Sequence, residues 1–182
     1  MNNDVSMSWV APNALNTYGS QLARILHACV HDGASVGFIT PWSIEDSLAF
    51  WIRQVYPAVK SGSRYLLIGE VDGQIAGTVQ LVCDTFPNQA HRADVSKLLV
   101  HPTFRKRGIA RSLMGALERN AADKQRSLLT LDTISGSAAE FLYLSIGFKK
   151  AGEIPDFARA PLENRLEPTT FMYKTLPTRS ML

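Results

Sequence analysis

The first third of the chain carries apolar residues at the spacing of amphipathic helices. In residues 14–31, leucine, isoleucine and valine side chains share one helical face, which predicts a helix over this range. A second helix is expected to begin at Ser43, because a serine followed three residues later by an acidic residue, here Asp46, is typical of a helix N-cap. We expect Pro57 to kink or end this second helix.

From residue 64 onward the pattern becomes that of β-strands. Asp72-Gly73 is a hairpin turn signal between the β-favouring residues 64–71 and 74–83, and Gly77 is a candidate bulge. Further strands are expected at residues 5–10, 92–100, 127–133, 148–154 and 171–176, the last two joined by a long proline-containing connection, and further helices at 109–124 and 137–145. This order predicts a mixed α/β sheet whose central strand–helix–strand unit is parallel and right-handed.

The composition is that of one globular domain. The chain has 182 residues, so we expect a single domain over 1–182, with its core at 5–176 and a flexible tail at 177–182. Apolar residues make up 46% and charged residues 19%, which excludes a disordered or fibrous chain. The formal charge of +3 is too small to argue for nucleic-acid binding.

Neither the N-terminus nor the cysteines indicate export. The first ten residues have no basic or apolar region of a signal peptide, and no stretch approaches the roughly 18 apolar residues of a membrane span. Cys29 and Cys83 are isolated and provide no disulfide framework. We therefore expect a cytoplasmic protein without a membrane partner.

A basic turn containing a glycine lies between the strand at 92–100 and the helix at 109–124. A helix N-terminus offers unpaired N–H groups and the positive end of the helix dipole, which together attract phosphate. Gly108 lets the backbone approach a ligand closely. The turn has neither the GxxxxGK[ST] nor the GxGxxG pattern, so we interpret it as a pyrophosphate site of another type. Its positive charge comes from Arg105, Lys106, Arg107 and Arg111.

Two motifs in this order resemble the cofactor motifs of the GNAT N-acetyltransferase superfamily. Residues 105–110, with the pattern R-x-x-G-x-A, are similar to its acetyl-CoA loop, and residues 139–148, with the pattern A-x-x-x-Y-x-x-x-G-F, are similar to its second cofactor motif. The likeness covers roughly residues 64–176. Within the superfamily, further segments resemble toxin-resistance acetyltransferases that act on a small amino-acid toxin: 32–38, 88–100, 131–133 and 152–155.

The resemblance implies a fold, a cosubstrate and a reaction. The implied fold is a mostly antiparallel α/β sheet of about seven strands, with helices on both faces and a splayed central parallel pair. The implied cosubstrate is acetyl-CoA, without a metal, and the reaction is direct acetyl transfer to an amine in a ternary complex. The residues expected to contact the cosubstrate are Leu98, Leu99 and Val100 through their backbone, and Arg105, Lys106, Arg107, Gly108, Ile109, Ala110 and Arg111.

The resemblance also implies catalytic roles, each with a structural alternative. Tyr143 is the expected general acid for the departing thiolate, with pocket tuning closing the gap between the two pKa values, or else it packs on its helix. Asp94 is the expected base or water-orienting carboxylate, and Asp132 is the second carboxylate. Either aspartate has a structural alternative as a strand-end residue paired with Arg92 or a backbone N–H.

Several residues have two interpretations. Gly136 stands where the superfamily often has an asparagine that contacts pantetheine, so Ser135 or Ser137 is expected to replace it, unless Ser137 only caps the following helix. Aromatic residues Phe38, Trp42 and Trp51 line either a substrate pocket or the core. A metal pair at His27 and His31 has helical spacing but no third ligand, so a surface or core-edge pair is expected instead.

The acceptor is expected to be the amine of a small molecule, such as an amino-acid-like toxin or antibiotic. Two alternatives remain open from the sequence, an acyl-CoA-binding module without turnover and a protein or peptide N-acetyltransferase. A homodimer is an expectation from the resemblance alone. Nucleic acid is not expected as a partner, because the basic turn is not part of a larger basic stripe.

Overall fold

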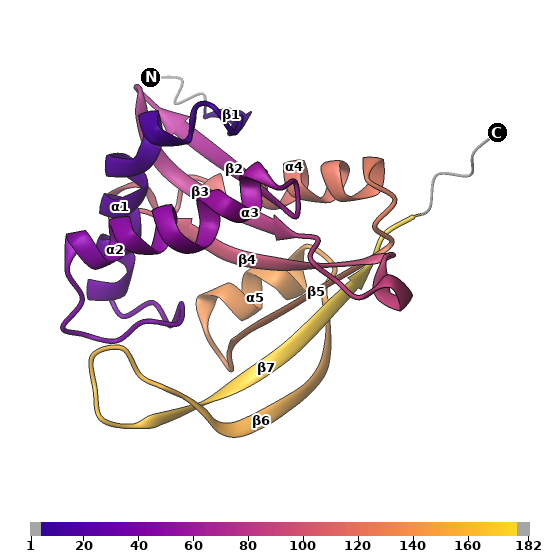
Figure 1. Ribbon diagram of the computed structural model, residues 1–182. Helices are drawn as coiled ribbons and strands as arrows, with labels where there is room; N and C mark the ends of the chain where they lie inside the picture. Colours follow the sequence, from indigo (N-terminus) through magenta and orange to yellow (C-terminus); the bar gives the residue numbers. More distant parts are fainter. Residues whose placement is uncertain (1–4, 178–182) are drawn as a thin grey trace.

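The computed structural model describes residues 5–177, which form one mixed sheet of seven strands in the order β1-β2-β3-β4-β5-β7-β6 (Figure 1). Only the β4–β5 pair is parallel. The predicted tail lies, from residue 178, outside the described residues. The strands are β1 (Ser6–Trp9), β2 (Arg64–Val71), β3 (Gln74–Val82), β4 (Arg92–Val100), β5 (Leu128–Ile134), β6 (Lys149–Arg159) and β7 (Leu166–Thr175).

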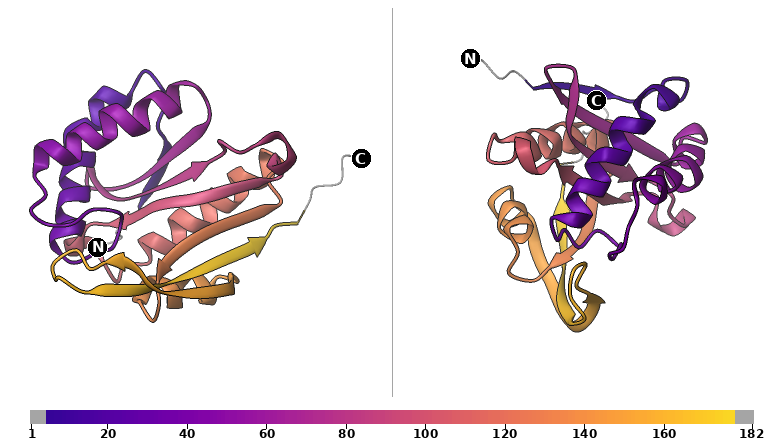
Figure 2. Two further views of the ribbon diagram at one scale, coloured as in Figure 1. Left: turned by 60° about the horizontal axis from the view of Figure 1, so that its bottom comes forward. Right: turned by 90° about the vertical axis from the view of Figure 1, so that its left-hand side faces the viewer.

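The helices cover both faces of the sheet (Figure 2). Side chains along β2 point alternately to the two faces of the sheet, and each face has its own hydrophobic core. Leu66 and Ile68 pack against α1–α3, whereas Leu67 packs against α4. The predicted mixed α/β fold with helices on both faces is therefore confirmed. The α-helices are α1 (Leu15–His31), α2 (Ile44–Phe50), α3 (Tyr56–Lys60), α4 (Ile109–Asp123) and α5 (Ala138–Ser145). A π-helical turn (Trp51–Val55) joins α2 to α3, and 3₁₀ turns precede β4 (Pro87–Gln89) and α4 (Pro102–Phe104).

The central parallel pair separates soon after it begins. Residues Arg92–Asp94 pair with Leu128–Thr130, and beyond them no described strand pairs with β4 on that side. On their outer sides β4 stays paired with β3 as far as Val100, and β5 with β7 as far as Ile134. Lys97 has a left-handed backbone, with φ of 51°, close to a shift in the β3–β4 register. The predicted splay is thus present, and it opens the sheet at its centre.

The predicted second helix has the expected start but a different end. Ser43 and Asp46 form a reciprocal capping box. Pro57 was expected to kink or end this helix, and helical structure continues past it to Lys60, so the second of these two alternatives is wrong. A π-helical turn precedes it, in which the Tyr56 N–H bonds to the Trp51 carbonyl, and Pro57 stands in the first turn of α3, where its missing N–H leaves no bond unmade.

The C-terminal connection is also different from the prediction. Residues 155–170 were expected to form a long connection, but most of them extend β6 and β7 into one hairpin. Pro155 is tolerated because β6 is an edge strand, and the register shifts between Ile154 and Ala158.

Gly77 is not the bulge residue of β3, and its lack of a side chain instead allows a helix to pack closely. Gly69 pairs with Gly77 and Glu70 pairs with Ile75, so the extra residue in β3 is Ala76. A Cβ added at Gly77 would lie 2.9 Å from side-chain atoms of both Ile109 and Leu113. The absent side chain therefore lets the first turns of α4 lie directly on β3 and β4.

We predict that Gly77→Ala lowers the free energy of unfolding by about 1–3 kcal/mol, because its methyl group overlaps two α4 side chains. Urea unfolding measures this change. Gly152→Ala is the control, because its Cβ would meet nothing within 4 Å. Equal stabilities for the two variants would contradict the packing role.

Candidate active site

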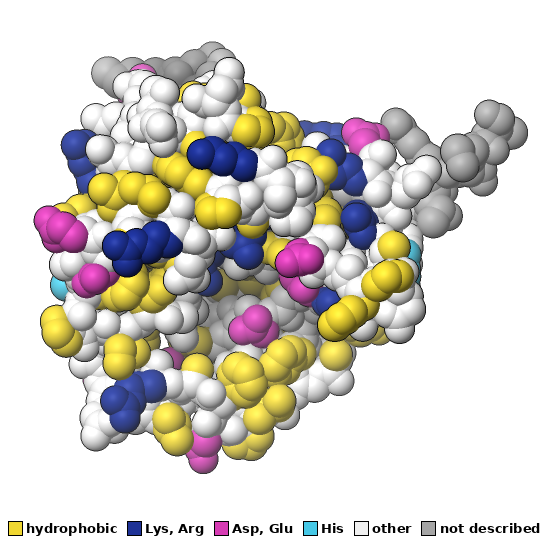
Figure 3. Space-filling model, in the orientation of Figure 1, with side chains coloured by type: hydrophobic (Ala, Val, Ile, Leu, Met, Phe, Trp, Pro, Cys, Tyr) yellow, Lys and Arg dark blue, Asp and Glu magenta, His cyan; other side chains and the backbone are white. Residues whose placement is uncertain are grey.

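The separation of β4 from β5 gathers the chemically active side chains around one opening. Asp94 stands at the last paired position of β4, opposite Thr130, and Asp132 lies two residues further along β5 on the same face. Tyr143 comes from α5, on the other face of the sheet. Figure 3 shows that the α1–α3 face is hollowed over β4 and β5, with acidic and basic side chains around the hollow.

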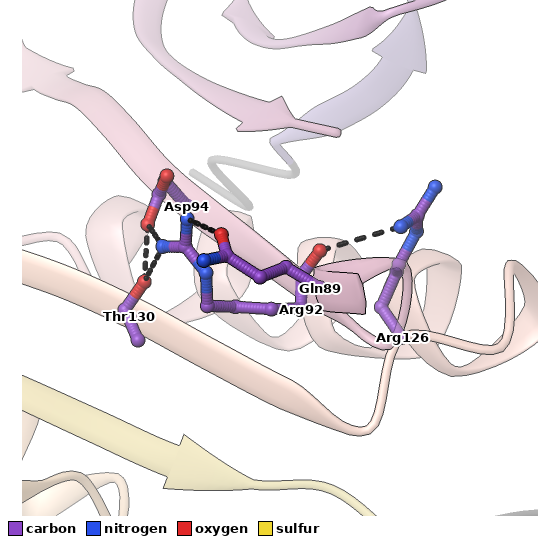
Figure 4. A network of polar contacts seen from close by, with 5 residues as sticks. All are labelled: Gln89, Arg92, Asp94, Arg126 and Thr130. Atoms are coloured by element: carbon purple, nitrogen blue, oxygen red, sulfur yellow. Dashed lines mark hydrogen bonds and ion pairs between the residues drawn. The ribbon is translucent and has the colours of Figure 1, made fainter. Parts of the chain in front are cut away.

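The carboxylate of Asp94 belongs to a polar network (Figure 4). Its Oδ1 lies 2.5 Å from Nη1 of Arg92 and accepts a hydrogen bond from the Thr130 hydroxyl. Arg92 also donates to Thr130 and, at 3.1 Å, to the side chain of Gln89. Oδ2 of Asp94 has no hydrogen-bond partner among the described residues, and the side chain is 40% exposed. The structural alternative, a pair with Arg92, is therefore present, and it leaves one oxygen free.

Asp132 is exposed and makes no ion pair within the described part of the chain. Its charge acts on groups of both faces of the opening. Burial and Arg64 lower the pKa of Lys97, and Asp132 offsets part of this shift. Burial raises the pKa of Tyr143, and Asp132 adds to that shift. Asp94 and Asp132 thus share one face at the point where the strands part, as expected, without contacting each other directly.

Tyr143 is a buried residue with a free hydroxyl. Its ring packs against Phe148 at 5.6 Å between centroids, and only 7% of the residue is exposed. The hydroxyl makes no hydrogen bond to residues 5–177. Burial raises the pKa of Tyr143, and the charge of Asp132 raises it further. Low polarity disfavours the phenolate, so the pKa of Tyr143 moves away from that of a thiol in water.

The turn between β4 and α4 presents unsatisfied backbone donors. Gly108 is the N-cap of α4 with φ of 78°, and no side chain caps the helix. The N–H groups of residues 109–111 form the first helical turn and have no partner inside the helix. A Cβ placed on Gly108 would meet nothing within 4 Å, so open space adjoins these donors.

The basic side chains of this turn differ in what they contact. Arg105 pairs with Asp32 and donates to the Val100 carbonyl at 3.4 Å, which ties the turn to the end of α1. Arg111 donates to Ser145 of α5 at 2.7 Å. Lys106 and Arg107 are exposed, and the guanidinium of Arg107 stacks on Phe104. Arg107 also donates to the Thr103 carbonyl at 3.5 Å, and neither Lys106 nor Arg107 makes an ion pair within the described residues.

The β4 residues that were expected to contact the cosubstrate through their backbone belong to a core strand. Leu99 is 2% exposed and packs against α1, whereas Leu98 packs against the α4 core. The Val100 carbonyl accepts from Cys29 as well as from Arg105. These side chains are core residues, and the strand still has no neighbour on the β5 side.

Ser137 caps α5, as its structural alternative predicted. Its hydroxyl accepts from the Glu140 N–H at 3.2 Å. Glu140 itself is a buried carboxylate that the sequence did not single out, because an acidic residue in a first helical turn normally faces solvent. It accepts from the Gly136 N–H and pairs with Lys150 of β6. Glu140 thereby holds the turn before α5, and with it the helix that carries Tyr143.

Three polar residues near the hollow were also missed. Lys97 is half-buried, and its ammonium lies 5.6 Å from the ring centroids of both Phe38 and Phe50. Gln80 is fully buried and accepts from Arg64 at 2.9 Å. In sequence, a lysine and a glutamine inside strands read as solvent-facing positions. Only the bulge and the register place them on the face of the opening.

The aromatic residues divide between the two predicted roles. Trp51 is fully buried and donates to the Leu22 carbonyl, so it belongs to the core. Phe38 and Trp42 are partly buried and stack at 4.2 Å in the loop before α2. This stacked pair lies next to Lys97 through Phe38.

The paired histidines make contacts with each other and with the α1–α2 loop. His27 and His31 stack at 4.2 Å, and Nε2 of His31 bonds to the Trp42 carbonyl. Residues 5–177 contain no group of three or more potential metal ligands. Among the helices of that same range, none is long and apolar enough to cross a membrane.

Residues 62–150, just under half of the chain, match the model of the acetyltransferase (GNAT) domain. The mixed sheet that opens between two parallel strands is shared with solved acetyltransferase structures.

A curated relative is similar over part of the chain. An uncharacterised N-acetyltransferase from the hisH–hisA intergenic region of Azospirillum brasilense is 33% identical over 105 residues, which are 57% of this chain. The match spans 60% of the length of that curated relative.

Solved structures share the fold over nearly the whole chain. An N-acetyltransferase from Staphylococcus aureus has a TM-score of 0.78 at 17% identity, covering 96% of this chain and 99% of its own. A ribosomal-protein-alanine N-acetyltransferase from Brucella melitensis has a TM-score of 0.75 at 22% identity, covering 94% and 99%. The yncA protein of Salmonella typhimurium, solved with its cofactor acetyl-CoA, has a TM-score of 0.74 at 20% identity, covering 98% of both chains.

We predict that Glu140→Gln lowers the free energy of unfolding at neutral pH by about 1–3 kcal/mol, because it removes the ion pair with Lys150. The hydrogen bond from Lys150 holds the pKa of Glu140 below its usual range. The stability from this carboxylate is therefore present above its unfolded pKa and lost as the pH falls through its folded pKa.

Denaturant unfolding at several pH values from neutral to acidic measures this effect. The difference between wild type and Glu140→Gln should shrink at acidic pH. Glu163→Gln is the control, because Glu163 pairs with Arg165 at the surface, where such pairs contribute little. A difference that does not change with pH would contradict the role of the ionised Glu140.

Proposed function

We propose that the chain transfers the acetyl group of acetyl-CoA directly to the amine of a small molecule in a ternary complex. The observation that carries this proposal is the opening between β4 and β5, where an uncapped helix, an unpaired strand edge, two carboxylates and a buried phenol meet. The match of residues 62–150 to the acetyltransferase (GNAT) domain model supports the reaction type.

The residues of the β4–α4 turn fit a pyrophosphate. The free N–H groups of residues 109–111, the open space at Gly108 and the exposed Lys106 and Arg107 provide donors and positive charge together. Arg105 would shape the turn, because its charge is already paired with Asp32. The pantetheine arm would add to the unpaired side of β4 at Leu98–Val100, where a backbone N–H would polarise the thioester carbonyl.

When bound, acetyl-CoA supplies an activated acyl group, and this chain's residues must manage two protons. An alkyl ammonium has to lose a proton before it can attack a thioester. Asp94 can accept it through its free Oδ2, directly or through a water, while Arg92 and Thr130 hold the other oxygen in place. Asp132 offers a second carboxylate on the same face. Either aspartate therefore suits the base, and the other would bind the ammonium group.

Tyr143 is proposed to protonate the departing thiolate. Its raised pKa keeps it in the protonated form over the whole working pH range. The same burial acts on a thiolate that leaves into this pocket and raises the thiol pKa as well. The proton transfer therefore depends on the difference between the pKa of Tyr143 and the pKa of the thiol, and burial shifts both values in the same direction.

A contact between two loops favours a small acceptor over a peptide. The N–H and the hydroxyl of Thr40, in the loop before α2, both donate to the Pro161 carbonyl in the β6–β7 turn at 3.0 Å. This bridge joins the two loops, so an extended peptide could not pass between them. Action on an amino-acid toxin, in the manner of the tabtoxin-resistance acetyltransferase of Pseudomonas, a homodimer and a cytoplasmic location stay predictions.

We predict that Tyr143→Phe lowers kcat for acetyl transfer on the order of 10²-fold and leaves acetyl-CoA binding nearly unchanged. Thiol release over a panel of amines measures turnover, and calorimetric titration with acetyl-CoA measures binding. Tyr65→Phe is the control, because Tyr65 packs on the edge of Trp9, away from the opening. Unchanged turnover in Tyr143→Phe would contradict the acid role.

We predict that Asp94→Asn and Asp132→Asn have different pH–rate profiles. Loss of the base should move activity to higher pH, because the reaction then needs amine that is already deprotonated in solution. Loss of the ammonium-binding carboxylate should mainly raise KM. The pH dependence of kcat and of kcat/KM, measured for both variants, separates the two roles. If both variants kept the pH profile of the wild type, both roles would be contradicted.

A further inference from the structure

We propose that the acceptor carries a carboxylate as well as an amine, and that Lys97, Arg64 and Gln80 bind this carboxylate on the α1–α3 face of the opening. The substrate class is then a zwitterion of the amino-acid type. This inference rests on the proposed acetyl transfer and deepens it.

Lys97 is a cation without an acceptor. Its ammonium lies between two aromatic rings, those of Phe38 and Phe50, each 5.6 Å away. None of its three N–H donors has a hydrogen bond or ion pair within residues 5–177. The titratable groups that act on it are Arg64, which lowers its pKa as burial does, and Asp132, which raises it.

Gln80 and Arg64 add buried donors that also lack acceptors. Gln80 is fully buried, and its Oε1 accepts a hydrogen bond from Arg64. The Nε2 of Gln80 has no hydrogen-bond partner. Nε of Arg64 is likewise buried and unpaired. Gln80 pairs across the sheet with Ser96, the residue before Lys97, so the three side chains occupy neighbouring positions of β2, β3 and β4.

This cluster has an excess of donors that an anion would satisfy. Buried donors without partners are costly and uncommon in native proteins, so several of them together indicate a ligand that brings acceptors. A carboxylate has two oxygens and about four acceptor positions, which suits an ammonium, a guanidinium and an amide N–H. The phosphates of the cosubstrate already have donors at the β4–α4 turn, so the missing anion belongs to the acceptor.

The opposite charges lie close enough together for one small zwitterion. Asp94 and Lys97 are three positions apart on β4, at most about 10 Å between Cα atoms. In a regular strand their side chains would point to opposite faces, but Lys97 has a left-handed backbone and contacts Phe38 and Phe50, on the same face as Asp94. Asp132 is near enough to act on the charge of Lys97. An acceptor with its amine at the aspartates and its carboxylate at Lys97 would be oriented by both groups.

The test compares amines in matched forms, namely an amino carboxylic acid, its primary amide, and the amine with neither group. Wild type should prefer the acid over the amide on the order of 10²-fold in kcat/KM, because the amide leaves the buried cation unpaired. Lys97→Met should bring this ratio close to one, mainly because kcat/KM for the amino acid falls. Lys97→Arg should keep most of the preference.

Lys124→Met is the matched control, because Lys124 also stacks on an aromatic ring, that of Tyr65, outside the opening. It should retain the wild-type ratio. Equal rates for acid and amide in wild type would overturn the proposal. So would equal losses for both forms in Lys97→Met, which is the result expected if Lys97 only packs against Phe38 and Phe50.

A binding measurement separates this inference from the proposed function. Ligands that bind the folded state raise Tm, so the acids should stabilise wild type more than the amides do, and should not do so in Lys97→Met. If no amine is acetylated but this pattern holds, the proposed function fails and the carboxylate site stands. If amines are acetylated and the Tm pattern is absent, the carboxylate site fails and the proposed function stands.

Discussion

The separation of β4 from β5 after Asp94 and Thr130 is the constraint on which the rest of the structure depends. A parallel pair that continued would use the backbone groups of β4 and cover the space between the helices of the two faces. Because the pair ends, one edge of β4 stays unpaired at the centre of the sheet. The left-handed backbone of Lys97 and the shifted β3–β4 register accompany this divergence, and Gly77 lets α4 begin directly beside it.

Charge is distributed around this opening according to how each group is held. Arg92 and Thr130 hold one oxygen of Asp94, Asp32 holds Arg105, and Lys150 holds the buried Glu140, so these groups set the shape of the site. Other groups are left without partners in the described chain: Oδ2 of Asp94, the ammonium of Lys97 and the first N–H groups of α4. The paired groups provide the scaffold, and the unpaired groups are the ones that ligands would satisfy.

The sequence predicted the elements well where local signals decide them, as at the Ser43 capping box and the Asp72-Gly73 hairpin. The sequence did not predict that the helix continues past Pro57 or that β6 continues past Pro155. A π-helical turn and an edge position remove the usual cost of these prolines, and neither is visible locally. Motifs led to Tyr143 and to the turn at Gly108. They did not lead to Lys97, Gln80 or Glu140, whose burial depends on register between distant strands or on a helix end packing under β6.

The central claim is that the unpaired edge of β4 and the uncapped start of α4 together receive acetyl-CoA. Amide hydrogen exchange with and without acetyl-CoA tests it most directly, because it reads the backbone groups themselves. The account predicts slower exchange at residues 98–100 and 108–111, with little change in β1 and β2 on the far side of the sheet. Binding of acetyl-CoA that leaves exchange at both segments unchanged would contradict it.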